Sequence, residues 1–267
     1  MNIDLFADSV EKQGAIGRLN AGVKLLATLL MTLALILVKD WVSAGSILLL
    51  ELIALRAVGV HPLRLLGRFW PVLFGALLSG WSTALLVEKT GRVVLEIGFL
   101  LVTTDSLATG FALMLRGLAM VLPGLLLIAT SDPTDIADSL AQTAKLPARF
   151  VLAALAALRL VGLMFTEWNA LGQARRARGL GGRDNPWQTL KTVGGQTFAL
   201  LVQAIRRGTR LSTTMEARGF GGPEPRTWAR QVTYSRGDLF FFLGCLLLIA
   251  AGYSISAAAG ELTFLWQ

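Results

Sequence analysis

Five apolar stretches, each about as long as a bilayer crossing, constrain the fold of this chain more than any other feature. They run from Ala21 to Val38, Trp41 to Val60, Phe69 to Val87, Leu107 to Ala129 and Leu239 to Ala259. A helix rises about 1.5 Å per residue, so stretches of this length match a hydrocarbon core of about 30 Å. A mean hydropathy of +0.61 and a hydrophobic content of 54% are too high for an ordinary soluble domain. The sequence therefore predicts an all-α integral membrane protein with about five transmembrane helices.

Basic residues gather at one side of these predicted spans. Lys and Arg near the ends of a span favour the cytoplasmic side. The polar amino terminus is therefore expected to be a cytoplasmic arm rather than a signal peptide, and the carboxyl terminus is expected to lie outside the cell. The residues that set this orientation flank the first span and the turn after the second: Lys12, Arg18, Lys24, Arg56, Arg64 and Arg68.

The connection at 88–105, predicted to lie outside, has two interpretations. Residues 92–104 are rich in Val, Ile, Leu, Phe and Thr between Gly91 and Asp105. This composition is typical of an extended flap, and it is also compatible with an early start of the fourth transmembrane helix.

The region from Ser131 to Asp238 carries most of the net charge of +8, with 15 Lys and Arg against 8 Asp and Glu. We therefore expect three domains: a membrane domain at 1–130, a cytoplasmic coupling-helix domain at 131–236 and a last transmembrane helix at 237–267. A sixth span at Ala148 to Trp168 would place Arg159 in the membrane and export the basic cluster that follows, so the charge rule disfavours it. The alternative is a true crossing with Arg159 paired inside the bundle.

Proline punctuation divides the basic region into one short and two long helices. Asp132 with Pro133 opens the short helix, which ends near Lys145. Pro147 opens a helix to about Arg178, and Pro186, after Asn185, opens one to about Arg218. Each long helix carries a stripe of apolar and small residues, for which packing is the expected role. The stripes are Val151, Leu155, Leu158, Gly162, Phe165, Asn169 and Gly172, and Trp187, Leu190, Gly194, Leu201, Ile205 and Gly208.

The two long helices end in the same hexapeptide. ARGLGG at 177–182 recurs 40 residues later as ARGFGG at 217–222. Gly179 and Gly219 suit the left-handed position that ends a helix, and Arg178 and Arg218 lie where the helix dipole favours a cation. A capping role alone would explain either copy, but the repeat favours a pair of docking ends.

These motifs resemble those of the transmembrane T component of energy-coupling factor (ECF) transporters, from about Asn20 to the final span. The resemblance rests on their order along the chain: four spans, the ending with Arg178-Gly179, the ending Glu216 to Phe220, and a last span. Other matching positions are Thr130 to Pro133, Leu146-Pro147, Arg159, Glu167, Arg226-Thr227 and Asp238. The chain departs from the family at Gly162, where a proline is common, and at Thr214, where alanine is common.

The resemblance implies a non-catalytic scaffold that joins a substrate-binding membrane S component to two cytoplasmic ABC-type ATPases, for uptake of a vitamin or a transition-metal ion. The chain itself is expected to bind no cofactor or metal, with ATP and Mg on the ATPases, and no nucleic acid. By analogy, structural roles in the coupling helices fall to Pro133, Pro147, Arg159, Glu167 and Pro186. The ATPase-docking residues by analogy are Ala177, Arg178, Gly179, Leu180, Glu216, Ala217, Arg218, Gly219 and Phe220.

The expected roles of other charged residues follow from their positions in the sequence. Glu51 and Arg116 lie within predicted spans, where they would form a buried pair or line an interface, and a structural role is favoured for both. A further set of arginines is expected to contact lipid headgroups or to form a solvated basic face: Arg175, Arg176, Arg206, Arg207 and Arg210.

Two other function classes remain open. A conventional ABC permease is disfavoured by two coupling ends on one chain. An integral-membrane transferase would use Asp132, Asp135 and Asp138, although a helix start also explains these aspartates. No phosphate-loop motif for ATP occurs, and a single Cys and a single His exclude a Cys/His zinc cluster.

Overall fold

The computed structural model describes residues 16–61, 66–67, 69–87, 93–97, 100–179, 186–222, 227–261 and 263. The chain forms two compact units, one from residues 1–139 with 232–267, and one from residues 140–231. These are unit 1 and unit 2.

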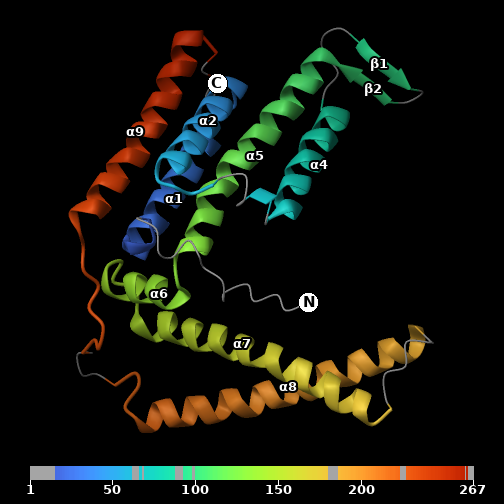
Figure 1. Cartoon of the computed structure of the whole chain (residues 1–267), viewed down its shortest axis with the longest axis vertical. Coiled ribbons are helices and arrows are strands. Elements are labelled where there is room, and N and C mark those ends of the chain that lie inside the picture. Colours follow the sequence, from blue (N-terminus) through green and yellow to red (C-terminus); the bar gives the residue numbers. More distant parts are fainter. Residues whose placement is uncertain are drawn as a thin grey trace. The chain divides into compact units, whose positions relative to one another are not determined.

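The described residues of unit 1 form a bundle of apolar helices (Figure 1). Its central helix is α5 (Thr104–Thr130), which packs against α1 (Ala21–Leu37), α2 (Trp41–Ala57) and α4 (Trp70–Leu86). The last helix, α9 (Arg236–Ala259), packs against α1 and α2, so the end of the chain completes the bundle formed by its beginning. A short 3-10 turn, η2 (Ile16–Arg18), precedes α1.

The predicted extended flap is present. Strands β1 (Val93–Ile97) and β2 (Leu100–Thr103) pair antiparallel and lead directly into α5 (Figure 1). The Thr103 side chain accepts a hydrogen bond from the Ser106 N–H, and the Ser106 hydroxyl accepts one from the Thr103 N–H, which closes a capping box. This cap explains why strand changes to helix here and why the alternative of an earlier helix start is wrong.

Glycines set the closest helix contacts of unit 1. A Cβ built on Gly80 of α4 would lie 2.7 Å from the Gly110 carbonyl oxygen of α5, and one on Gly110 would lie 2.5 Å from the Gly80 oxygen. In the contact between α2 and α9, a Cβ on Gly252 would lie 2.3 Å from Ile47 Cγ1. Small residues at such crossings let two helix backbones approach closely, which is how membrane helices commonly pack.

Unit 2 contains two long helices, α7 (Ala148–Ala177) and α8 (Pro186–Ala217). The short helix α6 (Pro133–Gln142) lies where the chain passes from unit 1 to unit 2. All three begin within a residue of the predicted prolines, and α7 runs without interruption through Gly162, the position at which the ECF family often has a proline.

Three helices of the described residues are long and apolar enough to cross a membrane, namely α5, α7 and α9, and α1 and α4 are shorter apolar helices. Helix α7 therefore meets the length and composition of a span. Its assignment to the cytoplasmic side rests on the charge rule and stays a prediction. The Arg159 side chain is exposed and forms no ion pair with a described residue, so the part of the chain that the structure describes does not supply the partner that the crossing alternative requires.

Candidate functional site

The end of α7 has the geometry that its sequence predicts. The Arg178 N–H donates to the Ala174 and Arg175 carbonyls at 3.3 and 3.1 Å, and the Gly179 N–H donates to the Arg176 carbonyl at 3.0 Å. Gly179 has a φ of 72°, the left-handed conformation expected of a helix-ending glycine. The side chain of Arg178 is exposed at this end. Leu180, the next predicted docking residue, lies outside the described residues.

Helix α8 ends in the same way. The Gly219 N–H donates to the Glu216 carbonyl at 2.9 Å, the Phe220 N–H donates to the Met215 carbonyl at 3.0 Å, and Gly219 has a φ of 77°. These two bonds are those of a Schellman motif. Arg218 is exposed, and Phe220 is half-buried. The prediction that the repeated hexapeptide ends both helices in a left-handed glycine is therefore confirmed.

The two arginine ends lie at opposite ends of unit 2. Helices α7 and α8 run antiparallel, so α7 ends where α8 begins and α8 ends beside the start of α7 (Figure 1). Arg149, in the first turn of α7, donates to the Gly221 carbonyl just beyond the end of α8. The helices have 30 and 32 residues, which at about 1.5 Å per residue makes each more than 40 Å long. Arg178 and Arg218 are thus presented on well-separated ends.

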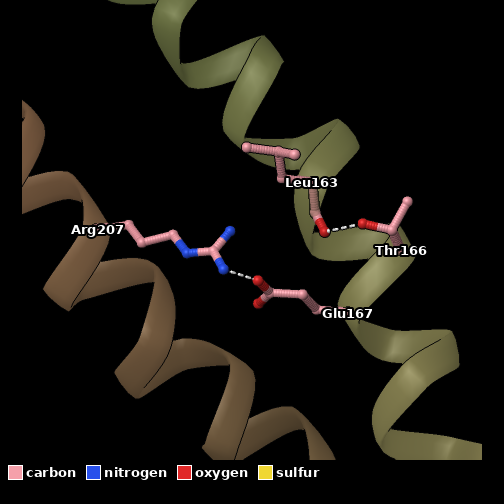
Figure 2. A network of polar contacts seen from close by, with 4 residues as sticks. All are labelled: Leu163, Thr166, Glu167 and Arg207. Carbon is pink, nitrogen blue, oxygen red and sulfur yellow. Dashed lines mark hydrogen bonds and ion pairs between the residues drawn. The ribbon is translucent and has the colours of Figure 1, made fainter.

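Polar contacts hold α7 and α8 together where they cross. The Arg207 guanidinium of α8 reaches across to the Glu167 carboxylate of α7 in a partly buried ion pair (Figure 2). Arg175 donates to the Thr192 carbonyl at 2.6 Å, and Gln196, only 5% exposed, donates to the Trp168 carbonyl. Charge-assisted bonds of this kind fix both the position and the register of two helices.

This crossing corrects three predictions. Arg207 and Arg175 were expected to contact lipid headgroups or solvent, but each bonds to the opposite helix because it lies on the facing side of its own helix. The apolar stripes were expected to pack, yet most of their large side chains are exposed in this chain. These exposed stripe residues are Leu158, Phe165, Trp187, Leu190, Leu201 and Ile205.

The aspartates considered for a transferase occupy the start of α6. Asp132 accepts a hydrogen bond from the Thr134 N–H at 2.9 Å, which is the capping role that a helix start predicts. Among the described residues, no group of three or more His, Cys, Asp or Glu side chains is placed to hold a metal ion. The described geometry therefore gives Asp132 a capping role and places Asp135 in the first turn of α6.

One polar cluster in unit 1 was missed by the sequence analysis, which used Lys24 only to orient the first span. Lys24 is 3% exposed, and its ammonium donates to the Thr130 carbonyl at 3.2 Å and to the Ser131 hydroxyl at 3.3 Å. It thus caps the carboxyl end of α5, where carbonyls lack helical partners. Beside it, Asp238 accepts hydrogen bonds from the Asn20 N–H and the Ser235 N–H, both at 2.7 Å. No local sequence signal identified this role of Lys24, because Thr130 is 106 positions away along the chain.

A second polar contact ties the start of α2 to α9. Asp40 accepts hydrogen bonds from the Ser43 N–H at 2.6 Å and from the Ser256 hydroxyl. Burial raises the pKa of the Asp40 carboxyl, but the hydrogen bonds from Ser256 and Ser43 more than offset this, so the pKa lies below its ordinary value of 3.8.

Glu51 and Arg116, two charged residues within the predicted spans, are not paired with each other. Both carboxylate oxygens of Glu51 are buried without a hydrogen-bond partner among the described residues, and Arg116 forms no ion pair with Glu51. The possibility that Glu51 and Arg116 form a buried pair is therefore wrong.

Comparison with known proteins agrees with this architecture. The model of the family described as "Cobalt transport protein" (CbiQ) matches residues 13–228. The energy-coupling factor transporter transmembrane protein EcfT of Bacillus subtilis is 29% identical over 196 residues, covering 70% of this chain and 72% of its own. EcfT 1 of Listeria monocytogenes is 26% identical over 258 residues, covering 90% and 93%.

The family match covers α1 to α8 with both arginine ends and stops before α9, and the relatives are bacterial membrane proteins of one kind. The chain belongs to the CbiQ family and is the transmembrane T component of an ECF-type transporter.

Proposed function

We propose that this T component couples two cytoplasmic ABC-type ATPase subunits to a separate substrate-binding S component in the membrane. ATP-driven movement of the ATPases would pass through α7 and α8 to the S component and reorient it for uptake. The chain is proposed to be non-catalytic and to bind no cofactor, with ATP and Mg on the ATPases. The transported substrate, a vitamin or a transition-metal ion, would be selected by the S component.

The observation that carries the proposal is the pair of equal helix ends in unit 2. Two ATPase subunits need two docking points, and the chain supplies two exposed arginines on helices that end in the same hydrogen-bonded turn. An arginine offers a planar fork of donors that suits carboxylates and carbonyls in a groove. Because the caps hold the backbone at φ of 72° and 77°, each arginine projects from a fixed turn.

The crossing of α7 and α8 supports transmission of force between these ends. Its polar bonds involve residues 167–175 of α7 and residues 192–207 of α8, so they lie before the docking arginine of each helix. A push on either end would therefore move both helices together. Directional bonds resist sliding better than a uniform apolar contact, since each donor has one acceptor within reach.

The proposed orientation follows the distribution of basic residues. We place the chain as a multi-pass protein in the bacterial plasma membrane, with its amino terminus and its coupling helices in the cytoplasm and its carboxyl terminus outside. The 15 Lys and Arg between Ser131 and Asp238 would then face the cytoplasm.

The proposal is tested by replacing both docking arginines in the tagged chain, expressed in its native host. We expect Arg178→Ala with Arg218→Ala to insert in the membrane but to lose the co-purifying subunits that carry phosphate-loop motifs. Truncating one partner of a buried interfacial charge pair costs about 2–5 kcal/mol, so each single variant should retain only part of the ATPases.

The matched control replaces two exposed arginines of the same helices that do not belong to the repeated hexapeptide, Arg176→Ala with Arg210→Ala. This double variant removes the same charge and should retain its ATPases. Normal recovery of ATPase subunits with the Arg178/Arg218 double variant, or equal loss with both double variants, would contradict specific docking by these two residues.

A further inference from the structure

Unit 1 contains a cavity of about 390 Å³ between α1, α2, α5 and α9. Its wall is almost entirely apolar and includes Met31, Leu55, Leu122 and Leu248, with the aromatic side chains of Phe240 and Phe241 on the α9 side. A volume of this size lies within the range of small-molecule sites, which begins at about 300 Å³. The apolar wall favours an aliphatic occupant.

Two polar side chains in the wall already have partners. The Lys24 ammonium donates to the end of α5, to the Thr130 carbonyl and the Ser131 hydroxyl. The Thr28 hydroxyl donates to the Lys24 carbonyl at 2.8 Å and lies 3.4 Å from the Pro123 carbonyl. Neither side chain needs a ligand to satisfy its hydrogen bonds.

Glu51 differs from these residues. It is 4% exposed, it lies in the cavity wall, and neither of its carboxylate oxygens has a hydrogen-bond partner among the described residues. Leaving such a group unsatisfied in an apolar interior costs several kcal/mol, so buried carboxyl groups normally have a donor or a cation beside them. An ionisable residue within a membrane span is for this reason a marker of a binding site or pathway.

We propose that the cavity binds a cationic amphiphile, with a primary ammonium group at Glu51 and an aliphatic chain along the apolar wall. An ionised carboxylate only accepts hydrogen bonds, and an ammonium group provides three donors together with the opposite charge. Free amines and lipids with a primary amine in the headgroup share this chemistry.

The first test measures thermal unfolding of the full chain in phosphatidylcholine nanodiscs, whose headgroups have no N–H donor, with n-hexylammonium as the probe. A ligand that binds the folded state raises the unfolding midpoint. We expect n-hexylammonium to raise the midpoint by at least about 3 °C more than 1-hexanol at the same concentration. The difference should disappear in Glu51→Gln, which keeps the size of the side chain and removes its charge.

The second test uses Cys245, the single cysteine of the chain, which is buried and lines the same cavity. We expect n-hexylammonium, and not 1-hexanol, to slow labelling of Cys245 by N-ethylmaleimide about tenfold, which corresponds to about 1.4 kcal/mol. Equal effects of amine and alcohol on the wild-type midpoint would overturn the proposal, and so would the absence of any effect. The comparison of amine and alcohol on the wild-type protein therefore tests the proposal even if Glu51→Gln does not fold.

The source of the ligand is distinguished by repeating the midpoint measurement in nanodiscs that contain phosphatidylethanolamine. If the lipid occupies the site, the wild-type midpoint is already raised and n-hexylammonium adds little. If n-hexylammonium still stabilises the protein, the occupant is a free amine. Neither result depends on the ATPase-docking residues, which lie on α7 and α8.

Discussion

The ion pair between Glu167 and Arg207 gives a quantitative prediction about the crossing of α7 and α8. We consider Glu167→Gln, Arg207→Met and the double variant. Glu167 is 18% exposed at its side chain and Arg207 is 36% exposed, so the pair is neither a surface contact nor fully buried. Exposed pairs contribute up to about 1 kcal/mol, and hydrogen bonds to charged groups contribute about 1.5–3 kcal/mol. We therefore expect a coupling energy of about 1 kcal/mol.

The two single variants should destabilise the contact between α7 and α8 by different amounts. Glu167 Oε2 is already buried without a hydrogen-bond partner among the described residues, so Arg207→Met leaves a carboxylate with neither oxygen paired. An unsatisfied buried group costs about 1–3 kcal/mol. Glu167→Gln keeps a carbonyl oxygen that can still accept from Arg207, so it should cost less. We expect about 2 kcal/mol for Arg207→Met and about 1 kcal/mol for Glu167→Gln.

The assay is backbone hydrogen exchange of α7 and α8, measured by mass spectrometry on the full chain in nanodiscs. A change of 1.4 kcal/mol in the opening free energy changes the exchange rate about tenfold. Peptides on both sides of the crossing should exchange faster in Arg207→Met than in Glu167→Gln, and the double variant should exchange more slowly than the two single effects predict together.

The control is Arg206→Met, which removes an exposed charge next to the pair. It should leave the exchange of α7 unchanged. If the effects of the two single variants on exchange simply add in the double variant, or if Arg206→Met has the same effect as Arg207→Met, the ion pair between Glu167 and Arg207 does not stabilise the contact between α7 and α8.

Two further predictions concern unit 1. Gly252→Ala should destabilise the protein by about 1–3 kcal/mol, because its new Cβ would meet Ile47 at 2.3 Å. The control is Gly244→Ala on the same helix, where a new Cβ would have no neighbouring atom within 4 Å. In thermal unfolding this control should be at least as stable as the wild type. Ser256→Ala should raise the lowered pKa of Asp40, because it removes one of the hydrogen bonds that hold this pKa down. The Asp40 carboxylate contributes stability that is present above pH 3.8 and is lost as the pH falls through the folded-state pKa, so in the variant this loss should begin at a higher pH than in the wild type. Unfolding midpoints at pH 3–7 that differ from the wild type by the same amount at every pH would contradict this.

The sequence was sufficient for features determined by neighbouring residues. The starts of α6, α7 and α8 follow from Pro133, Pro147 and Pro186, because a proline fixes its own φ and lacks an N–H. The ends of α7 and α8 follow from glycines that adopt a positive φ at little cost. Helices α1, α2, α4, α5 and α9 coincide with the five predicted apolar runs.

Contacts between distant residues were not predictable in the same way. Lys24 and Thr130 are 106 residues apart, and Arg207 and Glu167 are 40 apart, so nothing local distinguishes these side chains from solvent-exposed cations. Periodicity also misled the interpretation of the long helices, since a stripe of apolar residues shows which face avoids water but not what covers it. In this chain the crossing is polar, and the apolar faces are exposed.

The contact between Asp40 and Ser256 has a consequence for biosynthesis. The two residues are 216 positions apart, and α9 also supplies the glycine against which Ile47 fits. During synthesis α1 and α2 therefore leave the ribosome long before α9 is made. Until α9 is in place, the Asp40 carboxylate lacks the hydrogen bond from Ser256. Nascent chains arrested before residue 232 should accordingly be prone to degradation, and supplying the missing last helix as a separate peptide should rescue them.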